Sequence, residues 1–436
     1  MRLHCQPAVM PLRGTRIIRV VSEPLVQRTT PIRRLSWRHD PADSVTARIL
    51  RFNEGRDPER LAMKYQAMRQ SPFTFLRGTC HLFWEDWPRD SSLNSVPVTW
   101  VCGDLHFENF GTYKGDNRLV HFDINDFDEA VLAACTFDVT RYLTSLLVGA
   151  KTLHLGRRQA HRLGKAFLDA YVAALVVGKA RWVERATATG MVCDLLRALK
   201  ARKRRQLLKR RTTVENGRRR LRLDGKHALA VTREARQKVK AFMAAFAEQQ
   251  PKPRFFRVLD VARRIAGTGS LGVERYTILV EGKGSPDRNY LLDLKEARPS
   301  AVLPALSCAQ PAWKTDGERV VTVQRRTQAI SPALLQSVEL EGKSFVLREL
   351  QPVEDRLVLD HWKCKIGRLE GAIRTMAQVL AWAHLRGSGH QGAAIPDAFV
   401  DLGYERRWAE HALGYADEYA TKVERDWQEF RRMRPA

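Results

Sequence analysis

The chain has 436 residues, 44% of them hydrophobic, and a formal net charge of +26. This length is enough for about two or three domains with a substantial core, and no apolar run approaches the roughly 18 uncharged residues that a membrane-spanning helix needs. The seven cysteines stand singly without a C-x-x-C pair, which argues against a zinc ribbon or a disulfide framework and favours a cytoplasmic location.

Residues 1–45 are strongly basic and show little hydrophobic periodicity, so we expect an irregular extension there. No secretory signal is expected in it, because the apolar run at residues 17–21 is short and is interrupted by Arg19. From residue 46 to 250 we expect a mostly helical part, which also contains two polar loops.

These loops follow two short apolar segments between residues 98 and 122. Val98, Trp100 and Val101 lead into the sequence CGDLHFEN, and residues 119–122 lead into DINDFDEA. Both apolar segments are typical of short buried strands. Crowded carboxylates repel one another unless a cation lies between them, so the two turns predict a site for a hard metal such as Mg²⁺ together with a polyphosphate.

The spacing within these turns is close to that of the catalytic core of kinase-like phosphotransferases. Asn109 follows Asp104 by five residues, and Asp123 follows Asn109 by fourteen. In such a core, an aspartate at the position of Asp104 accepts the proton of the substrate hydroxyl, and residues at the positions of Asn109 and Asp123 bind metal. We expect Asp126 as a further metal ligand and keep Asp128 as an alternative. The competing interpretation is an acidic turn that caps a helix or binds a structural calcium ion.

Two neighbouring residues refine this interpretation. Cys102 stands where the aminoglycoside and choline kinase branch has a histidine, which is a departure from that pattern. Asp138 stands at the start of a predicted helix, where that branch has an aspartate that braces the catalytic loop through its backbone amides. An acidic residue in the first turn of a helix is also common for reasons of charge alone.

Residues 197–226 carry much of the positive charge and contain only Glu215 and Asp224 as acidic residues. Leucines between 195 and 208 suggest an amphipathic helix. The simplest interpretation is a solvated basic face on an insertion. The alternative is an electrostatic binding site for an acidic partner such as a nucleic acid, a phosphorylated substrate or an anionic membrane.

Residues 265–297 combine a G-x-G-x-x-G motif with two predicted strands, at 276–280 and 290–294. The second strand ends at Lys295. Glycines allow backbone amides to approach phosphates closely, and a lysine neutralises them, so this pattern is typical of the nucleotide-binding part of a kinase small lobe. The predicted nucleotide contacts in this segment are Gly267, Gly269, Ser270, Gly272 and Lys295.

The glycine motif has two alternative interpretations. A dinucleotide-binding fold requires a helix directly after the glycines, whereas the residues after Gly272 prefer strand. An ordinary glycine-rich hairpin is the other alternative. A kinase lysine usually pairs with a helix glutamate, for which Glu318 is a weak candidate.

Further along the chain, residues 345–350 form an apolar strand that runs into a polar connector, like the strand that precedes a kinase hinge. Glu349 and Leu350 are therefore predicted nucleotide contacts. From about residue 366 to 387 the sequence has helical periodicity and resembles the large-lobe helix that normally precedes the catalytic loop.

This order of motifs differs from that of an ordinary kinase, because the glycines and Lys295 follow Asp104 rather than precede it. We therefore expect an α+β, kinase-like two-lobe fold that is circularly permuted, with a β-rich small lobe and a helical large lobe. The expected organisation is a basic extension at 1–45, a large-lobe-like helical part at 46–250, a β-rich small lobe at 251–355, and C-terminal helices at 356–436 that pack on the large lobe.

The chain resembles a known family over about residues 50–390. The segments SPFTFLRG, CGDLHFENFG, FDINDFDEA, FDVTRYLTSL, GTGSLG and LLDLKEA occur in this order in the bacterial domain-of-unknown-function family 2252. This family is thought to be related to the protein kinase-like superfamily. The resemblance implies the fold and the nucleotide site, but it supplies no substrate.

The predicted function is phosphoryl transfer from ATP, with Mg²⁺, to an unknown hydroxyl-bearing small molecule or protein. Lys295 and the glycine amides would hold the phosphates, Asn109 and Asp123 the metal, and Asp104 the acceptor hydroxyl. One alternative is a nucleotidyltransferase or a nucleotide-binding pseudoenzyme on the same fold. Another is a nucleic-acid-binding protein that uses residues 197–226. A two-metal phosphoesterase ranks low, because no further set of histidine and aspartate ligands is evident.

Overall fold

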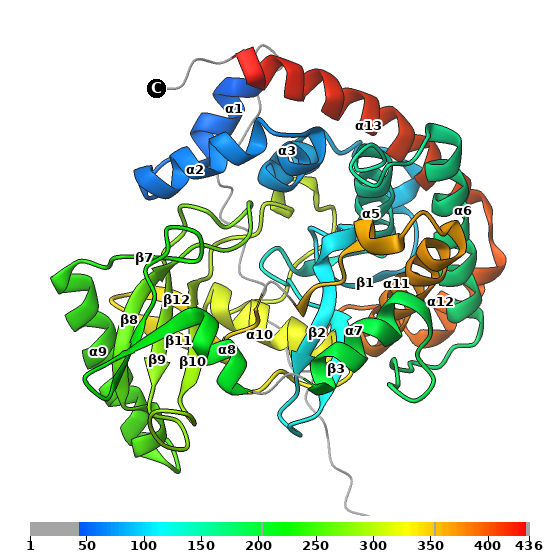
Figure 1. The fold of residues 1–436 in the computed structure, drawn as a ribbon. Helices are drawn as coiled ribbons and strands as arrows, with labels where there is room; N and C mark the ends of the chain where they lie inside the picture. Colours follow the sequence, from blue (N-terminus) through cyan, green and yellow to red (C-terminus); the bar gives the residue numbers. More distant parts are fainter. Residues whose placement is uncertain (1–42, 202–203, 353–354, 433–436) are drawn as a thin grey trace, which may run out of the picture.

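The structure is a computed structural model that describes residues 43–201, 204–352 and 355–432. It is a mixed α+β fold, with a curled six-stranded sheet beside a large group of helices (Figure 1). Most of the extension predicted at 1–45 lies outside the described residues. Within the described part of the chain, no helix is both long and apolar enough to cross a membrane.

The six-stranded sheet is antiparallel throughout, because each of its pairs is formed by strands that run in opposite directions. In spatial order its strands are β11 (Gln336–Leu340), β12 (Lys343–Glu349), β10 (Tyr290–Glu296), β9 (Arg275–Val280), β8 (Val258–Arg264) and β7 (Ala228–Leu229). The strands predicted at 276–280 and 290–294 are confirmed.

One face of this sheet is apolar and is covered by α9 (Arg233–Glu248) (Figure 1). Val239 and Met243 of α9 pack against Ile278 and Leu292 of the sheet. Since alternate residues of a strand point to opposite faces, Lys295 lies on the other face from Leu292. Because β7 and α9 pack with the sheet, the β-rich part begins before residue 251, where the sequence had placed its start.

The helical part is built around α11 (Ile366–Gly387), which contacts α6 (Arg157–Val176), α7 (Gly190–Ala201), α10 (Asp316–Thr327) and strand β1 (Val98–Val101). It also contains α5 (Thr136–Val148), α12 (Pro396–Tyr404) and α13 (Arg407–Arg432). Aromatic side chains fill its core; for example, Tyr142 of α5 stacks on Phe167 of α6 with ring centroids 3.9 Å apart. The helix predicted at about 366–387 is confirmed.

Four short helices precede the first strand, and two of them, α1 and α3, pack on α13 (Figure 1). They are α1 (Val45–Phe52), α2 (Pro58–Met68), α3 (Pro72–Gly78) and α4 (Cys80–Glu85). The side chains of Ser44, Asp57 and Ser71 cap the first three by accepting hydrogen bonds from backbone amides in the first turn. Each helix is short, so its position is set mainly by packing: α1 packs on α13, α3 on α13 and α5, α2 on α3, and α4 on α1.

Two small antiparallel pairs bring the polar loops together. β1 (Val98–Val101) pairs with β4 (Val131–Ala134), and β2 (Phe110–Lys114) pairs with β3 (Val120–Ile124). The loop 102–109 connects β1 to β2, and the loop 125–130 connects β3 to β4. Both loops therefore leave the same pair of neighbouring strand ends, and the Asn125 amide donates to the Asn109 carbonyl at 2.8 Å.

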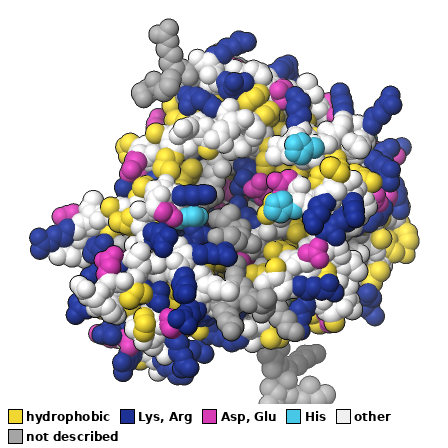
Figure 2. All heavy atoms as spheres, in the orientation of Figure 1, with side chains coloured by type: hydrophobic (Ala, Val, Ile, Leu, Met, Phe, Trp, Pro, Cys, Tyr) yellow, Lys and Arg dark blue, Asp and Glu magenta, His cyan; other side chains and the backbone are white. Residues whose placement is uncertain are grey.

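The basic tract at 197–226 forms the end of α7, α8 (Arg204–Arg211) and a hairpin of β5 (Thr212–Glu215) and β6 (Arg218–Leu221). Residues 202–203 lie outside the described part. The tract packs on the sheet, because Leu208 and Leu221 are buried against Leu291 and Leu350. Figure 2 shows Lys and Arg side chains over much of the visible surface, including the region of the sheet.

Candidate active site

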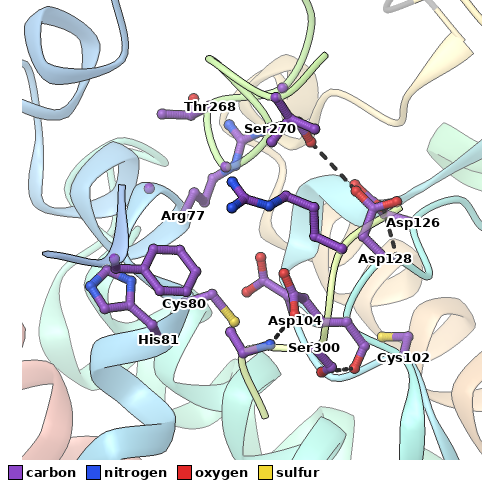
Figure 3. A pocket seen from close by; sticks show the side chains of 18 of the residues that line it. Arg77, Cys80, His81, Cys102, Asp104, Asp126, Asp128, Thr268, Ser270 and Ser300 are labelled. Carbon is purple, nitrogen blue, oxygen red and sulfur yellow. Dashed lines mark hydrogen bonds between the residues drawn. The ribbon is translucent and has the colours of Figure 1, made fainter. Parts of the chain in front are cut away.

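A cavity of about 740 Å³ lies where the glycine segment, the two polar loops and helices α1–α4 meet. Figure 3 shows side chains from all three regions that point into it. The predicted site residues that line it are Asp104, Asn109, Asp126, Asp128, Gly267, Gly269, Ser270 and Lys295. The fold thus gathers residues that lie up to about two hundred positions apart in the sequence.

Asp104 lies in the loop after β1 and is held by Arg141 of α5. The Arg141 guanidinium is fully buried and donates from Nε and Nη2 to Oδ1 of Asp104, at 3.0 and 2.8 Å. Burial raises the pKa of Asp104, although the positive charge of Arg141 opposes this rise. A carboxylate with a raised pKa is better suited to accept a proton near neutral pH.

The loop that carries Asp104 is fixed by the buried carboxylate of Asp138, as the sequence predicted. The backbone amides of Cys102 and Gly103 each donate to Asp138 at 2.9 Å. The His384 Nε2 lies 3.3 Å from the same carboxylate, and its Nδ1 is 2.7 Å from the Tyr171 hydroxyl. The sequence offered no signal for His384, because it lies on α11, far from this loop in the chain.

Asn109 ends a short 3-10 helix, Phe107–Asn109, at the edge of the cavity. Its side-chain oxygen accepts a hydrogen bond from the His106 amide at 2.8 Å, which fixes the orientation of the carboxamide. An amide oxygen has two lone pairs, so the second is available to a metal ion.

Lys295 meets the second polar loop at the floor of the cavity. Its ammonium forms an ion pair with Asp128 and lies 4.0 Å from Asp126 Oδ1. Burial lowers the pKa of Lys295 to about 8. Burial alone would raise the pKa of Asp126, but the nearby cations Lys295 and Arg348 outweigh it and lower that pKa.

Asp123 is placed differently from Asp126, although only two residues separate them. Its carboxylate is 2% exposed and accepts hydrogen bonds from the amides of Ile124 and Ala329, at 2.9 and 3.1 Å. It lies on β3 and does not line the cavity. Of the two aspartates that were predicted to bind metal, the structure brings only Asp126 to Asp104 and Lys295.

The oxygen-rich donor set at the cavity floor fits a hard divalent cation such as Mg²⁺. Among the described residues, the acidic, histidine and cysteine side chains form no group of three that could hold a metal ion by themselves. Asp126, Asp128 and Asn109 are the oxygen-bearing side chains of the cavity that could hold such a cation, with its remaining ligands supplied from outside the protein.

The glycine segment closes over the cavity between β8 and β9. Gly267 and Gly272 have positive φ angles of 72° and 88°, which residues with a Cβ rarely adopt. A Cβ on Gly272 would also lie 2.8 Å from the Cβ of Arg56. The Ser270 hydroxyl is 3.5 Å from Asp128, so the segment reaches the second polar loop.

Glu349 and Leu350 lie outside the cavity. The Glu349 carboxylate pairs with Arg204 of the basic tract at 3.2 Å, and Leu350 is buried beside Leu208 and Leu221. Glu318, the proposed partner of Lys295, instead accepts a hydrogen bond from the Lys314 amide at 2.7 Å. The carboxylate that pairs with Lys295 is that of Asp128.

The comparison with family models gives one assignment. The model described as "Uncharacterized protein conserved in bacteria (DUF2252)" matches residues 56–433, which is most of the chain. No curated protein and no solved structure matches the chain. The protein therefore belongs to DUF2252, a family of uncharacterized proteins that is conserved in bacteria.

Proposed function

We propose that the protein is an ATP- and Mg²⁺-dependent phosphotransferase with a circularly permuted, kinase-like arrangement of two lobes. The observation that carries the proposal is the convergence of Asp104, Asp126 and Lys295 around one cavity under a glycine segment. Phosphoryl transfer needs mainly positioning and charge stabilisation, and these residue types supply both.

In this mechanism the glycine-segment amides and Lys295 hold the phosphates. Asn109 and Asp126 hold Mg²⁺, with Asp128 as a further ligand once Lys295 has turned to a phosphate. Bound Mg²⁺ neutralises the charge that develops on the transferred group. Oδ2 of Asp104, which Arg141 does not contact, accepts the proton of the acceptor hydroxyl, while Arg141 holds Oδ1 in place.

The proposal constrains the nucleotide base as well. If the base binds next to Glu349 and Leu350, then Leu208 and Leu221 must move, because they cover Leu350. The phosphate part of the site needs no such movement, because Lys295 and Ser270 already line the cavity.

The test is calorimetric titration of the full chain with ATP in the presence and absence of Mg²⁺. We expect Mg²⁺-dependent binding by the wild type. Binding by Lys295→Met should be at least about tenfold weaker, because the substitution removes the ammonium group that would hold the phosphates. Lys240→Met is the matched control, since Lys240 is exposed on α9. A folded wild-type protein that does not bind millimolar ATP would exclude the proposal.

A further inference from the structure

The cavity continues beyond Asp104 into a recess formed by α1–α4. In Figure 3, Cys80 and His81 lie to one side of Asp104, whereas Asp126 and Asp128 lie to the other. The acceptor recess, as we call it, is lined by Phe52, Arg56, Lys64 and His81. If the nucleotide phosphates occupy the side of Asp126, the acceptor must reach Asp104 from this recess.

Lys64 is the most unusual residue of the recess. Its side chain is fully buried on α2, yet it forms no ion pair with any carboxylate among the residues that the structure describes. Its ammonium donates to Asn53 Oδ1 at 2.9 Å and lies 3.4 Å from the Gly269 carbonyl. An ammonium has three donors, so at least one is available to a ligand. Burial lowers the pKa of Lys64 well below its usual value, and neighbouring Arg56 lowers it further.

Arg56 adds a second cation to the same wall. Its Nη1 donates to the carbonyls of Gly269 and Leu271, at 2.9 and 3.2 Å, while its buried Nε has no hydrogen-bond partner within the described chain. It too forms no ion pair with a described carboxylate. Lys64 is fully buried and Arg56 is half-buried, and among the described residues their charged groups donate only to neutral oxygens. Two neighbouring cations without an anionic partner are costly in the free protein. An anionic ligand between them would remove that cost.

His81 supplies a polar surface of a different kind. Its ring is 2% exposed and stacks on Phe52, with centroids 3.9 Å apart, and neither ring nitrogen has a hydrogen-bond partner among the residues that the structure describes. Burial lowers the pKa of His81 well below its usual value, so the ring is neutral near pH 7. A neutral imidazole offers one donor and one acceptor, which together match a hydroxyl group.

We propose that the acceptor is a small hydroxylated anion, whose carboxylate or phosphate group binds between Lys64 and Arg56. A hydroxyl of the same molecule contacts His81, and another reaches Asp104. This inference rests on the proposed function and identifies the class of its substrate. In the reaction, the acceptor oxygen forms a bond to the γ-phosphorus, the bond from that phosphorus to the bridging oxygen breaks, ADP leaves with the electron pair, and the hydroxyl proton passes to Asp104.

The test uses three probes on the full chain: inorganic phosphate, glycerol 3-phosphate and glycerate. Calorimetry is carried out on the Lys295→Met variant, because this substitution removes the lysine of the nucleotide-phosphate site. In this background we expect phosphate to bind still, and to bind at least tenfold more weakly when Lys64→Met or Arg56→Gln is added. Lys165→Met on the exposed side of α6 is the matched control. Loss of phosphate binding in Lys295→Met alone, or its retention with Lys64→Met and with Arg56→Gln, would overturn the inference.

Comparison of the probes then defines the ligand. Tighter binding of glycerol 3-phosphate than of glycerate assigns a phosphate as the anionic group, and the reverse order assigns a carboxylate. His81→Phe should lower the affinity for the hydroxylated probe that binds best and should leave the affinity for inorganic phosphate unchanged. If the affinity for the hydroxylated probe is also unchanged, the role of His81 is wrong. If Lys64→Met does not fold, two other variants decide the result. Arg56→Gln should weaken phosphate binding, and the conservative Lys64→Arg should keep it. Phosphate binding without ATP binding would contradict the proposed function alone.

Discussion

Two hollows of the molecule differ in size: Asp104, Asp126 and Lys295 surround a cavity of about 740 Å³, the open end, whereas the sheet face beside Leu350, the closed end, leaves a space of only about 30 Å³. The first end has room for a polyphosphate and an acceptor. The second has room for about one water molecule. Part of the basic tract makes this difference, because Leu208 and Leu221 cover Leu350.

The two ends also differ in how their charges are used. Between them, on the same sheet face as Lys295, the buried Asp293 is paired with Arg264 and Arg275 at 2.7 and 2.6 Å. Burial alone would raise the pKa of Asp293, but these arginines hold it well below its usual range. Charges at this position are satisfied within the protein, while Lys64 and Arg56 at the open end have no ion pair with a carboxylate in the described part of the chain. This difference supports the proposal that ligands bind at the open end.

The largest effect is expected from Asp104→Asn, which removes the proposed base at the open end. Turnover should fall by about 10²–10⁴-fold, because general base catalysis contributes that much, while ATP affinity stays within about twofold. Measurement of ADP release with an acceptor, beside calorimetry with ATP, separates the two effects. Unchanged turnover would contradict the assigned role of Asp104.

The next largest effect should distinguish two aspartates that lie close together in the sequence. Asp126→Asn should weaken Mg²⁺-dependent ATP binding by about tenfold or more, because it removes a metal ligand. Asp123→Asn should leave binding nearly unchanged and lower the free energy of unfolding by about 1–3 kcal/mol, because its buried carboxylate accepts backbone hydrogen bonds. Calorimetry and urea unfolding of both variants provide the measurements. Asp116→Asn, at an exposed position, is the control, and the reverse pattern would show that Asp123 is the ligand.

A smaller, graded effect should follow from the pKa of Lys295, which burial lowers to about 8. A lysine is charged below its pKa, so phosphate groups should bind best below pH 8. Affinity should then fall by up to about tenfold per pH unit above it. Lys295→Arg should remove this fall, because a guanidinium stays charged. Calorimetry with ATP from pH 6.5 to 9.5 tests this, and an identical pH dependence of both proteins would contradict it.

The smallest effect on ligand binding is expected at the closed end. Leu208→Ala should weaken the packing of the basic tract on Leu350, at a cost of about 2–5 kcal/mol in stability. If a nucleotide base binds there, ATP affinity should rise by a few fold, because the basic tract covers Leu350 in a smaller fraction of the molecules. Thermal unfolding confirms the loss of packing, and calorimetry measures the affinity. A lower stability with unchanged ATP affinity would place the base elsewhere.

The sequence by itself determined the local features of this protein. The glycines, the strand that carries Lys295 and the two polar loops followed from alternation, turn chemistry and spacing. The bracing role of Asp138 followed from the resemblance to the aminoglycoside and choline kinase branch. These features depend on neighbouring residues, so a linear pattern is sufficient to find them. The α+β class followed from the same signals.

Only the tertiary structure decided which of these residues share a site. It turned Asp126 rather than Asp123 into the cavity, paired Glu349 with Arg204, buried Leu350 under the basic tract, and brought His384 to Asp138. It also placed Lys64 and His81, which look unremarkable in the sequence, in one recess. The physical reason is that burial and the pairing of charges depend on segments that are distant in the chain, and no local pattern encodes which distant segment covers a given side chain.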